Sequence, residues 1–484
     1  MTPQADDQVI CIIGAGYVGL VTAAGLAEAG RQVKVVEVDA DRRAAVAAGI
    51  SPIFEPGLDE LLSAVVASGH LRAVETMSAG VAGAGIVIVA VGTPPTHDGE
   101  ADLSQVRQAV DQALGEVAPG AVIAIKSTVP PGTTRALARG SSRKDVAFVM
   151  FPEFLREGSA LEDLRHPSRV VVGGEDMAAV RRVAALLGGP DTTRLLCDSV
   201  SAELVKYGSN AFLATKISFI NEMAQLCELT GADIEHVADG MGLDPRIGRS
   251  FLSAGLGWGG SCFPKDVRAL ETSAGYHGQS FWLLKAAIEV NSQQRRRFTA
   301  KLLQGLGGSL EGRRVAILGL AFKPFTDDMR QAPALEVVRQ LEDLGAIVVA
   351  TDPVALARAR PLLPGTSLVD DPYDAVTGAD AVGLVTEWPV YRELDWGRVF
   401  AQMRGRLVVD GRNCLDSRAI TGRGGIYVSM GRRTRGLPET THAHVDPSAA
   451  GAARTERQPT LPDAEGVDPG HEPSEGIRAL PRRS

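Results

Sequence analysis

The strongest constraint on the fold is an apolar run, Val9–Ile13, that leads directly into the glycine-rich turn Gly14-Ala15-Gly16-Tyr17-Val18-Gly19. An Ala-rich helical pattern follows, and a second β-rich run at residues 33–38 contains Glu37, about 20 residues beyond the turn. In such a unit the first glycine makes the tight turn, the second admits a pyrophosphate, and the third lets the helix pack closely on the strand. The pattern predicts a dinucleotide site, the alternative being a structural turn in a nucleotide-free α/β domain.

Glu37 indicates which dinucleotide to expect. A carboxylate at the end of the second strand accepts hydrogen bonds from a ribose 2′-hydroxyl and repels a 2′-phosphate, so it favours NAD. Arg42 lies close enough in the sequence to leave NADP open.

Two more loops follow strands of the same predicted sheet, at residues 91–94 and 127–132. Ligands of open α/β sheets bind beyond the carboxyl ends of the strands. The hydroxyls of Thr93, Ser127 and Thr128 are therefore candidates for contacts with ribose or nicotinamide, although each loop taken alone is more often a simple turn.

The alternation of strand and helix defines the domains. Apolar β-rich runs at residues 86–91, 121–125, 147–150 and 170–172 continue the first sheet, a helical pattern covers 201–230, and strands return at 315–318, 347–350, 381–385 and 407–409. Strands that are apolar on both faces predict parallel sheets covered by helices. We predict the α/β class, with two Rossmann-like doubly wound parallel-sheet domains joined by a long central helix. The expected boundaries are residues 1–200, 201–300 and 301–430, followed by a disordered tail at 431–484, which holds seven prolines and no aromatic residue.

Composition narrows the functional classes. A net charge of −8 argues against a nucleic-acid or anionic-membrane surface. The longest clean apolar run, residues 86–91, is far shorter than the roughly 18 residues of a membrane helix. Five cysteines without a pairing pattern and an acidic N-terminus without a secretory signal indicate a cytoplasmic protein with reduced thiols. With only 8 histidines, we expect no metal.

The most unusual segment is the glycine-rich loop that ends in Cys262. Its glycines, Gly255, Gly257, Gly259 and Gly260, remove side chains so that a ligand can approach the backbone. A nucleophilic cysteine acts as the thiolate, and a nearby cation lowers its pKa. Lys265 is the closest cation in the sequence, although this does not fix its position in space.

Two other segments carry candidate polar groups. Lys206 and Asn210 are four residues apart and share a helix face, which is solvated surface unless that face meets the thiol loop. Residues 151–158 follow a strand and contain Glu153 and Glu157, which fits a helix start as well as a functional segment.

Taken together and in order, these segments resemble the UDP-glucose 6-dehydrogenase family of nucleotide-sugar dehydrogenases over roughly residues 8–430. The segments that carry the resemblance are GAGYVG, VGTP, STVPPGT, FPEFLREG, ELVKYGSNAFLATKISFINE, RIG, GWGGSCFPKD, LGLAFKPFTDDMR and DGRN. Phe151 stands where the family more usually has Asn, and Trp258 stands where Phe is common. The residues beyond 430 have no counterpart in the family pattern.

The resemblance implies an NAD-dependent, two-step oxidation of the primary alcohol of UDP-glucose to the carboxylate of UDP-glucuronate. Cys262 would form a thiohemiacetal and then a thioester. Lys206 and Asn210 would stabilise the oxyanion, Asp266 and a water held by Thr128 would transfer protons, and Glu157 would act as the base for hydrolysis.

The resemblance also implies the binding residues. Substrate contacts are expected from Glu153, Phe154, Leu155, Arg156, Glu157, Lys206, Asn210, Phe251, Leu252, Ser253, Ala254, Gly255 and Gly259, with Lys323 and Arg412 from the second α/β domain and Arg246 from a neighbouring subunit. Cofactor contacts are expected from Gly14, Gly16, Tyr17, Val18, Gly19, Glu37, Arg42, Thr93, Ser127, Thr128, Glu157, Lys265 and Arg330. The long helix would form the core of a homodimer or a higher homo-oligomer.

Three alternatives stay open on the sequence. The substrate could be another sugar nucleotide, GDP-mannose or a UDP-N-acetylhexosamine. A non-catalytic NAD-binding or assembly protein is a different class, against which the intact Cys262, Lys206, Asn210 and Asp266 argue. A thiol-dependent aldehyde dehydrogenase would not explain the second α/β domain.

Overall fold

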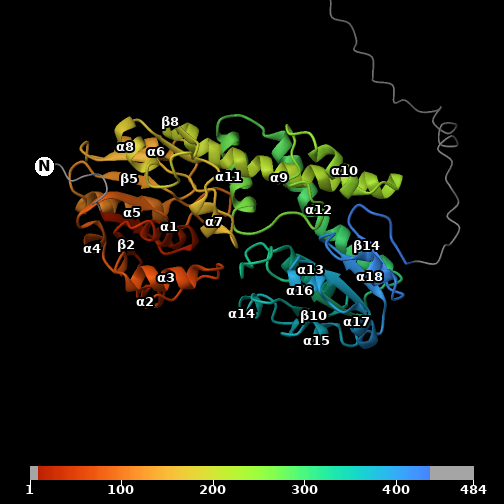
Figure 1. The fold of residues 1–484 in the computed structure, drawn as a ribbon. Helices are drawn as coiled ribbons and strands as arrows, with labels where there is room; N and C mark the ends of the chain where they lie inside the picture. The colour runs from red at the N-terminus through yellow and green to blue at the C-terminus, as the bar shows by residue number, and fades with distance from the viewer. Residues whose placement is uncertain (1–8, 437–484) are drawn as a thin grey trace, which may run out of the picture. The chain divides into compact units, whose positions relative to one another are not determined.

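The computed structural model describes residues 9–436 of the 484-residue chain, and these contain two β-sheets with a helical segment between them in the sequence (Figure 1). The greater part of the predicted tail, residues 437–484, lies outside the described residues. Within residues 9–436 no helix combines the length and the apolar character needed to cross a membrane.

The first sheet has eight strands in the order β3-β2-β1-β4-β5-β6-β7-β8. The pairs from β3 to β6 are parallel, but β6 pairs antiparallel with β7, so the last two strands run against the others. The predicted parallel sheet is therefore confirmed for the six strands β1 to β6, whereas β7 and β8 run in the opposite direction. The strands are β1 (Val9–Ile13), β2 (Val33–Val36), β3 (Leu71–Val74), β4 (Ala84–Val89), β5 (Val122–Ile125), β6 (Ala147–Met150), β7 (Val170–Gly174) and β8 (Arg194–Cys197).

Both faces of this sheet are buried. Consecutive residues of a strand point to opposite faces, so each strand contributes side chains to two cores. In β1, Ile10 and Ile12 pack in one hydrophobic core, and Cys11 and Ile13 pack in the other. The helices of this domain are α1 (Tyr17–Glu28), α2 (Ala40–Ala47), α3 (Leu58–Ala67), α4 (Met77–Val81), α5 (Ser104–Glu116), α6 (Thr133–Gly140), α7 (Ala160–Arg165) and α8 (Met177–Ala184). The sheet thus has the two covered faces that its apolar strands predict.

The helical segment is built on α9 (Ser199–Thr230), which is 32 residues long and is drawn in yellow-green in Figure 1. Asp198 caps its first turn by accepting the Ser201 N–H at 3.1 Å. Gly231 ends it with a φ of 81°, a left-handed conformation that favours glycine. Against α9 pack α10 (Ile234–Gly242), α11 (Phe263–Tyr276) and α12 (Trp282–Gly305).

The second sheet has six strands in the order β11-β10-β9-β12-β13-β14, which repeats the order of the first six strands of the N-terminal sheet. Its strands are β9 (Arg314–Leu318), β10 (Ile347–Thr351), β11 (Ser367–Leu368), β12 (Ala381–Leu384), β13 (Leu407–Asp410) and β14 (Ile426–Ser429). Its helices are α13 (Pro333–Asp343), α14 (Leu356–Ala359), α15 (Pro372–Val376), α16 (Pro389–Arg392), α17 (Trp396–Gln402) and α18 (Ser417–Thr421). All its strand pairs are parallel, so it shares the topology of strands β1 to β6 of the first sheet.

An acidic residue follows the second strand of that topology in both domains. Glu37, directly after β2, accepts the N–H of Ala15 at 3.0 Å and that of Asp39 at 2.9 Å. Asp352, directly after β10, is buried and accepts five N–H groups between 2.8 and 3.0 Å, from Leu320, Ala321, Val354, Ala355 and the Trp388 indole.

The fold continues past the expected end of the second domain at residue 430. The Gly431 N–H donates to Glu228 Oε1 at 2.7 Å, and its carbonyl accepts the Ile234 N–H at 3.1 Å. Arg435 pairs with Tyr427 in a short antiparallel bridge. Residues 431–436, which the sequence assigned to a disordered tail, are thus bonded to α9, α10 and β14. Their composition resembles that of the tail, but backbone groups make these contacts.

Candidate active site

Cys262 lies where the glycine-rich loop enters α11, and its side chain is half-buried. Burial raises the pKa of its thiol to about 11, and the carboxylates of Glu153, Asp266 and Glu157 add to the rise, while the Lys206 ammonium opposes it. The thiol is therefore protonated near neutral pH. The cation that most favours its anion is Lys206 of α9, whereas Lys265, its neighbour in sequence, is bonded to Asp266 at 2.6 Å.

The helix face that carries Lys206 and Asn210 meets the thiol loop, as a functional role requires. Lys206 Nζ donates to Glu153 Oε1 at 2.7 Å, and both side chains are buried. Asn210 Nδ2 donates to Asp266 Oδ2 at 2.6 Å, which ties α9 to α11. Burial alone would make both partners of the Lys206–Glu153 pair neutral, but their attraction raises the pKa of the lysine and lowers that of the glutamate. Both are thus ionised.

A cavity of about 470 Å³ opens beside this cluster. The predicted site residues among those that line it are Glu153, Phe154, Leu155, Arg156, Lys206, Asn210, Phe251 and Cys262. The cavity brings together the thiol, an ammonium, an amide and a carboxylate, so a carbonyl placed there would meet a nucleophile and two hydrogen-bond donors.

Lys126 lines the same cavity, but it was not predicted from the sequence as a site residue. It directly follows β5, is only 2% exposed, and its Nζ lies 3.9 Å from the centroid of the Phe151 ring. Burial lowers its pKa to about 8, with Glu153 opposing the shift and Lys206 adding to it. The ring of Phe151, the residue that departs from the family pattern, thus covers a second buried ammonium. The signal that could have identified Lys126 was its position directly before Ser127 and Thr128, which were themselves predicted site residues.

Glu157 stands between the thiol and the C-terminal domain. Its carboxylate accepts Ser261 Oγ at 3.1 Å and Thr326 Oγ1 at 3.4 Å, and Arg330 lies 3.6 Å away. Burial raises the pKa of Glu157 to about 7, helped by Asp328 and opposed by Arg330 and Lys323. A carboxylate that titrates near neutral pH suits general base catalysis.

A larger cavity, about 1110 Å³, lies at the glycine turn after β1 and is lined from both α/β domains. The predicted cofactor residues that line it are Gly14, Gly16, Tyr17, Glu37, Arg42, Glu157 and Arg330. A Cβ at Gly16 would meet no atom within 4 Å, whereas one at Gly19 would lie 2.0 Å from the Gly14 carbonyl oxygen. Open space at the second glycine and close packing at the third fit a bound dinucleotide.

Several predicted cofactor residues line neither cavity. Val18 and Gly19 belong to α1, and Thr93 is buried behind its loop. Ser127 Oγ donates to the Val91 carbonyl at 2.7 Å, and Thr128 is half-buried in the same loop. The roles of these residues, and that of Lys265, remain predictions.

The predicted substrate residues beyond the cavity fall into two groups. Leu252 and Ala254 pack in a small core with α9 and α10, Ser253 is exposed beside them, and a Cβ at Gly255 or Gly259 would clash with the backbone of Gly411 or Gln331. Arg412 donates to the carbonyls of Val385 and Gly257 at 2.7 and 3.1 Å, joining the second domain to the glycine loop. Lys323 is half-buried, and Glu157 and Cys262 lie among the charged groups that act on it.

Arg246 lies apart from the site of its own chain. Its side chain is 88% exposed and is paired with Asp244 at 2.6 Å. This position is compatible with the expected role in a neighbouring subunit, which stays a prediction.

Two buried acids that were not predicted position the site loops. Glu203 of α9 accepts the Thr134 N–H at 2.8 Å and also binds the Gly132 N–H, holding the loop that carries Thr128. Glu55 accepts the N–H groups of Gly158 and Ala160 at 2.6 and 2.7 Å and the hydroxyl of Tyr17, so it fixes the segment of Glu157. Only their burial marks these acids, and the sequence does not reveal it.

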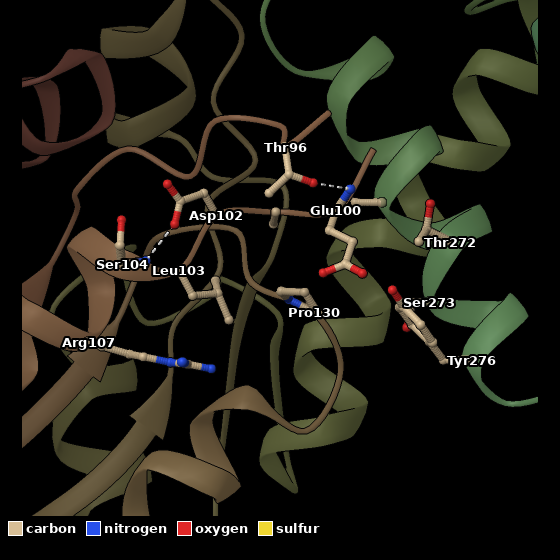
Figure 2. A pocket seen from close by; sticks show the side chains of 12 residues that line it. Thr96, Glu100, Asp102, Leu103, Ser104, Arg107, Pro130, Thr272, Ser273 and Tyr276 are labelled. Atoms are coloured by element: carbon tan, nitrogen blue, oxygen red, sulfur yellow. Dashed lines mark hydrogen bonds between the residues drawn. The ribbon is translucent and has the colours of Figure 1, made fainter. Parts of the chain in front are cut away.

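Another cavity, of about 410 Å³, lies between the loop before α5 and the end of α11 (Figure 2). Glu100 and Pro130 line it together with Thr272, Ser273 and Tyr276 of α11. It contains none of Cys262, Lys206 or Asn210, so it is separate from the site of the thiol.

Comparison with known proteins finds three family models that match successive parts of the chain. Models of the UDP-glucose/GDP-mannose dehydrogenase family match residues 8–187 (NAD binding domain), 200–293 (central domain) and 316–417 (UDP binding domain). A UDP-glucose 6-dehydrogenase of Rhizobium meliloti is 43% identical over 87% of this chain and 99% of its own. The corresponding protein of Pseudomonas aeruginosa is 45% identical over 88% and 98%. The structure of a UDP-glucose dehydrogenase from the archaeon Pyrobaculum islandicum matches with a TM-score of 0.81 at 38% identity, covering 90% of this chain and 100% of that one.

Proposed function

Because the chain belongs to the UDP-glucose/GDP-mannose dehydrogenase family and has its NAD-binding domain, we propose that this NAD-dependent oxidoreductase converts UDP-glucose to UDP-glucuronate. The observation that carries the proposal is the cavity in which Cys262 meets Lys206 and Asn210, with Glu157 reaching from the thiol to the cofactor cavity. NAD, when bound, accepts the hydride in each of two oxidations. The glycine turn, Glu37 and Arg330 would hold it.

In the first oxidation the primary alcohol loses a hydride and a proton and becomes an aldehyde. Lys206 and Asn210 donate hydrogen bonds to the oxygen on the reacting carbon, an arrangement that stabilises negative charge there as the proton leaves. Asp266, already bonded to Asn210, keeps that amide oriented. The proposed proton acceptors are Asp266 and a water held by Thr128.

A covalent tether keeps the aldehyde while the cofactor is exchanged. Cys262 Sγ adds to the aldehyde carbon, the carbonyl electron pair moves to oxygen, and a thiohemiacetal results. Loss of a second hydride from this carbon, together with the proton on its oxygen, gives a thioester. Glu157 then removes a proton from water, which attacks the thioester carbon. The C–S bond breaks, the sulfur takes up the proton from Glu157 and becomes the thiol again, and the acid is released as the carboxylate and a proton.

Support for UDP-glucose comes from the names of the relatives that share 43–45% identity with this chain. GDP-mannose or a UDP-N-acetylhexosamine is the alternative substrate. A panel of these three sugar nucleotides, read by NADH absorbance and product analysis, tests the choice. We expect two NADH per sugar with UDP-glucose as the best substrate, and a higher kcat/KM for either alternative would overturn the assignment.

Glu37 is expected to determine cofactor affinity. Replacing it with Ala removes an acceptor for the ribose diol, so NAD binding should weaken by about 1–3 kcal/mol. Glu75→Ala is the matched control, because Glu75 lines the same cavity but is exposed and makes no hydrogen bond to the glycine turn among the contacts of residues 9–436. The NAD dissociation constants of the Glu37→Ala and Glu75→Ala variants, measured by calorimetry, test this expectation. Equal use of NADP and NAD by the unsubstituted enzyme would contradict this role of Glu37.

We further propose that the enzyme is a homodimer joined along α9. Phe212, Phe219 and Leu226 recur every seven residues on this helix and are exposed by 67%, 48% and 51% in the single chain. A seven-residue apolar repeat forms a continuous stripe along one side of a helix. Pairing the stripes of two copies would cover these three apolar side chains. In such a dimer Arg246 would reach the substrate of the partner subunit.

The double substitution Phe212→Glu and Phe219→Glu should convert the dimer to monomers, since charges in an apolar interface are strongly destabilising. Sedimentation velocity would show the change in mass. Leu344→Glu, at an exposed apolar position of the second α/β domain, is the control and should leave the mass unchanged. A dimer that persists in the double variant would show that its interface lies elsewhere.

A further inference from the structure

Ser261 lies between the Cys262 thiol and the Glu157 carboxylate. Its Oγ lies 3.6 Å from Cys262 Sγ and donates to Glu157 Oε1 at 3.1 Å. Within residues 9–436 no other polar group lies within hydrogen-bonding distance of that sulfur. The thiol, the hydroxyl and the carboxylate therefore form a continuous chain of hydrogen-bonding groups.

We propose that the Ser261 hydroxyl relays the thiol proton of Cys262 to Glu157 as the thiohemiacetal forms. The S–H bond breaks and its proton passes to Ser261 Oγ, while the hydroxyl's own proton passes to Glu157 Oε1. The sulfur electron pair forms the bond to the aldehyde carbon, and the carbonyl pair moves to oxygen beside Lys206. Nothing is oxidised or reduced in this step. The relay rests on the proposed function, since it supplies the proton path for the tether.

The neighbouring groups leave Glu157 as the acceptor. Lys206 is protonated and held by Glu153, and Asp266 accepts from both Asn210 and Lys265. The charged groups that act on the thiol are Glu153, Glu157 and Asp266, which disfavour its anion, and Lys206, Lys323 and Arg330, which favour it. Those facing Glu157 are Asp328, Arg330 and Lys323. With a pKa raised to about 7, Glu157 is available both as anion and as acid near neutral pH.

The relayed proton also has an exit. Glu157 lines the cofactor cavity together with Arg330 and Thr326, so it can return its proton to water there. The carboxylate is then restored before it acts as the base in thioester hydrolysis. One carboxyl group thus serves two successive steps, provided that a hydroxyl links it to the thiol.

The test is a single-turnover measurement with full-length enzyme in excess over UDP-glucose. In Ser261→Ala the first NADH should form at the unsubstituted rate, because alcohol oxidation does not use the thiol. The second should slow by about 100-fold or more, the usual size of a general base effect. Ser261→Thr keeps a hydroxyl and should recover most of the second rate. Failure of the unsubstituted enzyme to give two NADH would refute the proposed function, not the relay alone.

Two readouts separate a relay from a structural role. The second-NADH rate should rise with pH through about 7 as Glu157 ionises, and this rise should be absent in both Ser261→Ala and Glu157→Gln. The double variant should be no slower than the slower single variant, because both changes break one path. Multiplied effects, an undiminished second rate in Ser261→Ala, or a rise that persists through about pH 7 in that variant would each overturn the relay.

Discussion

Replacing Cys262 with serine should stop the reaction after one NADH per sugar. A serine hydroxyl has no accessible anion near pH 7, so it cannot match the sulfur as a nucleophile towards the aldehyde. Hydride transfer from the alcohol needs no thiolate and should proceed once in each active site. In a single-turnover NADH trace with enzyme in excess over UDP-glucose, the unsubstituted enzyme should give two NADH and the variant about one or fewer.

Cys197→Ser is the matched control, since Cys197 is also a partly buried free thiol but lies at the end of β8. It should leave both NADH steps intact, and NAD affinity should be unchanged in both variants. Two NADH per sugar from Cys262→Ser at near the unsubstituted rate would remove the thiol from the mechanism.

Replacing Lys206 with methionine is expected to have the second large effect, on both turnover and folding. The variant loses a charged donor to the developing oxyanion, an effect of about 10²–10³ in kcat. It also leaves Glu153 buried without its 2.7 Å partner, which should cost about 3–5 kcal/mol of unfolding free energy. Stopped-flow turnover and denaturant unfolding measure the two losses separately.

A double variant separates the loss of turnover from the loss of stability. Lys206→Met combined with Glu153→Gln removes the unpaired charge, so stability should largely return while turnover stays low. Recovery of turnover together with stability would mean that Lys206 acts only by holding the fold. A single Lys206→Met variant that is as stable as the unsubstituted protein would contradict the buried ion pair.

The sequence was most informative where burial is complete. The apolar runs at β1 and β6 have the bounds that their sequence predicts, because every residue after the first is buried. The edge strands β3 and β8 were missed because they are half-exposed and carry Arg72 and Arg194 in place of continuous apolar residues. The reversal at β7 was also missed, since strand direction depends on how the connecting segment crosses the sheet and not on the strand's own residues.

The site was predictable as a set of residues but not as a set of contacts. Cys262 stands out through its glycine loop, yet the cation that faces it comes from α9 and not from its neighbour Lys265. Likewise, the charged groups that raise or lower the pKa of Glu157 come from a loop of the second α/β domain. Such pairings arise when distant segments pack together, and no local pattern encodes them.

The two acids that follow equivalent strands differ in how much acceptor capacity they retain. A carboxylate offers about four lone-pair directions. Asp352 accepts five N–H groups of its own chain and is saturated, whereas Glu37 accepts two backbone N–H groups, with Arg42 3.5 Å away. The repeated topology therefore presents one acid with acceptor capacity left and one without. By this criterion only the first domain keeps an acid, at the end of its second strand, that can accept hydrogen bonds from a ribose.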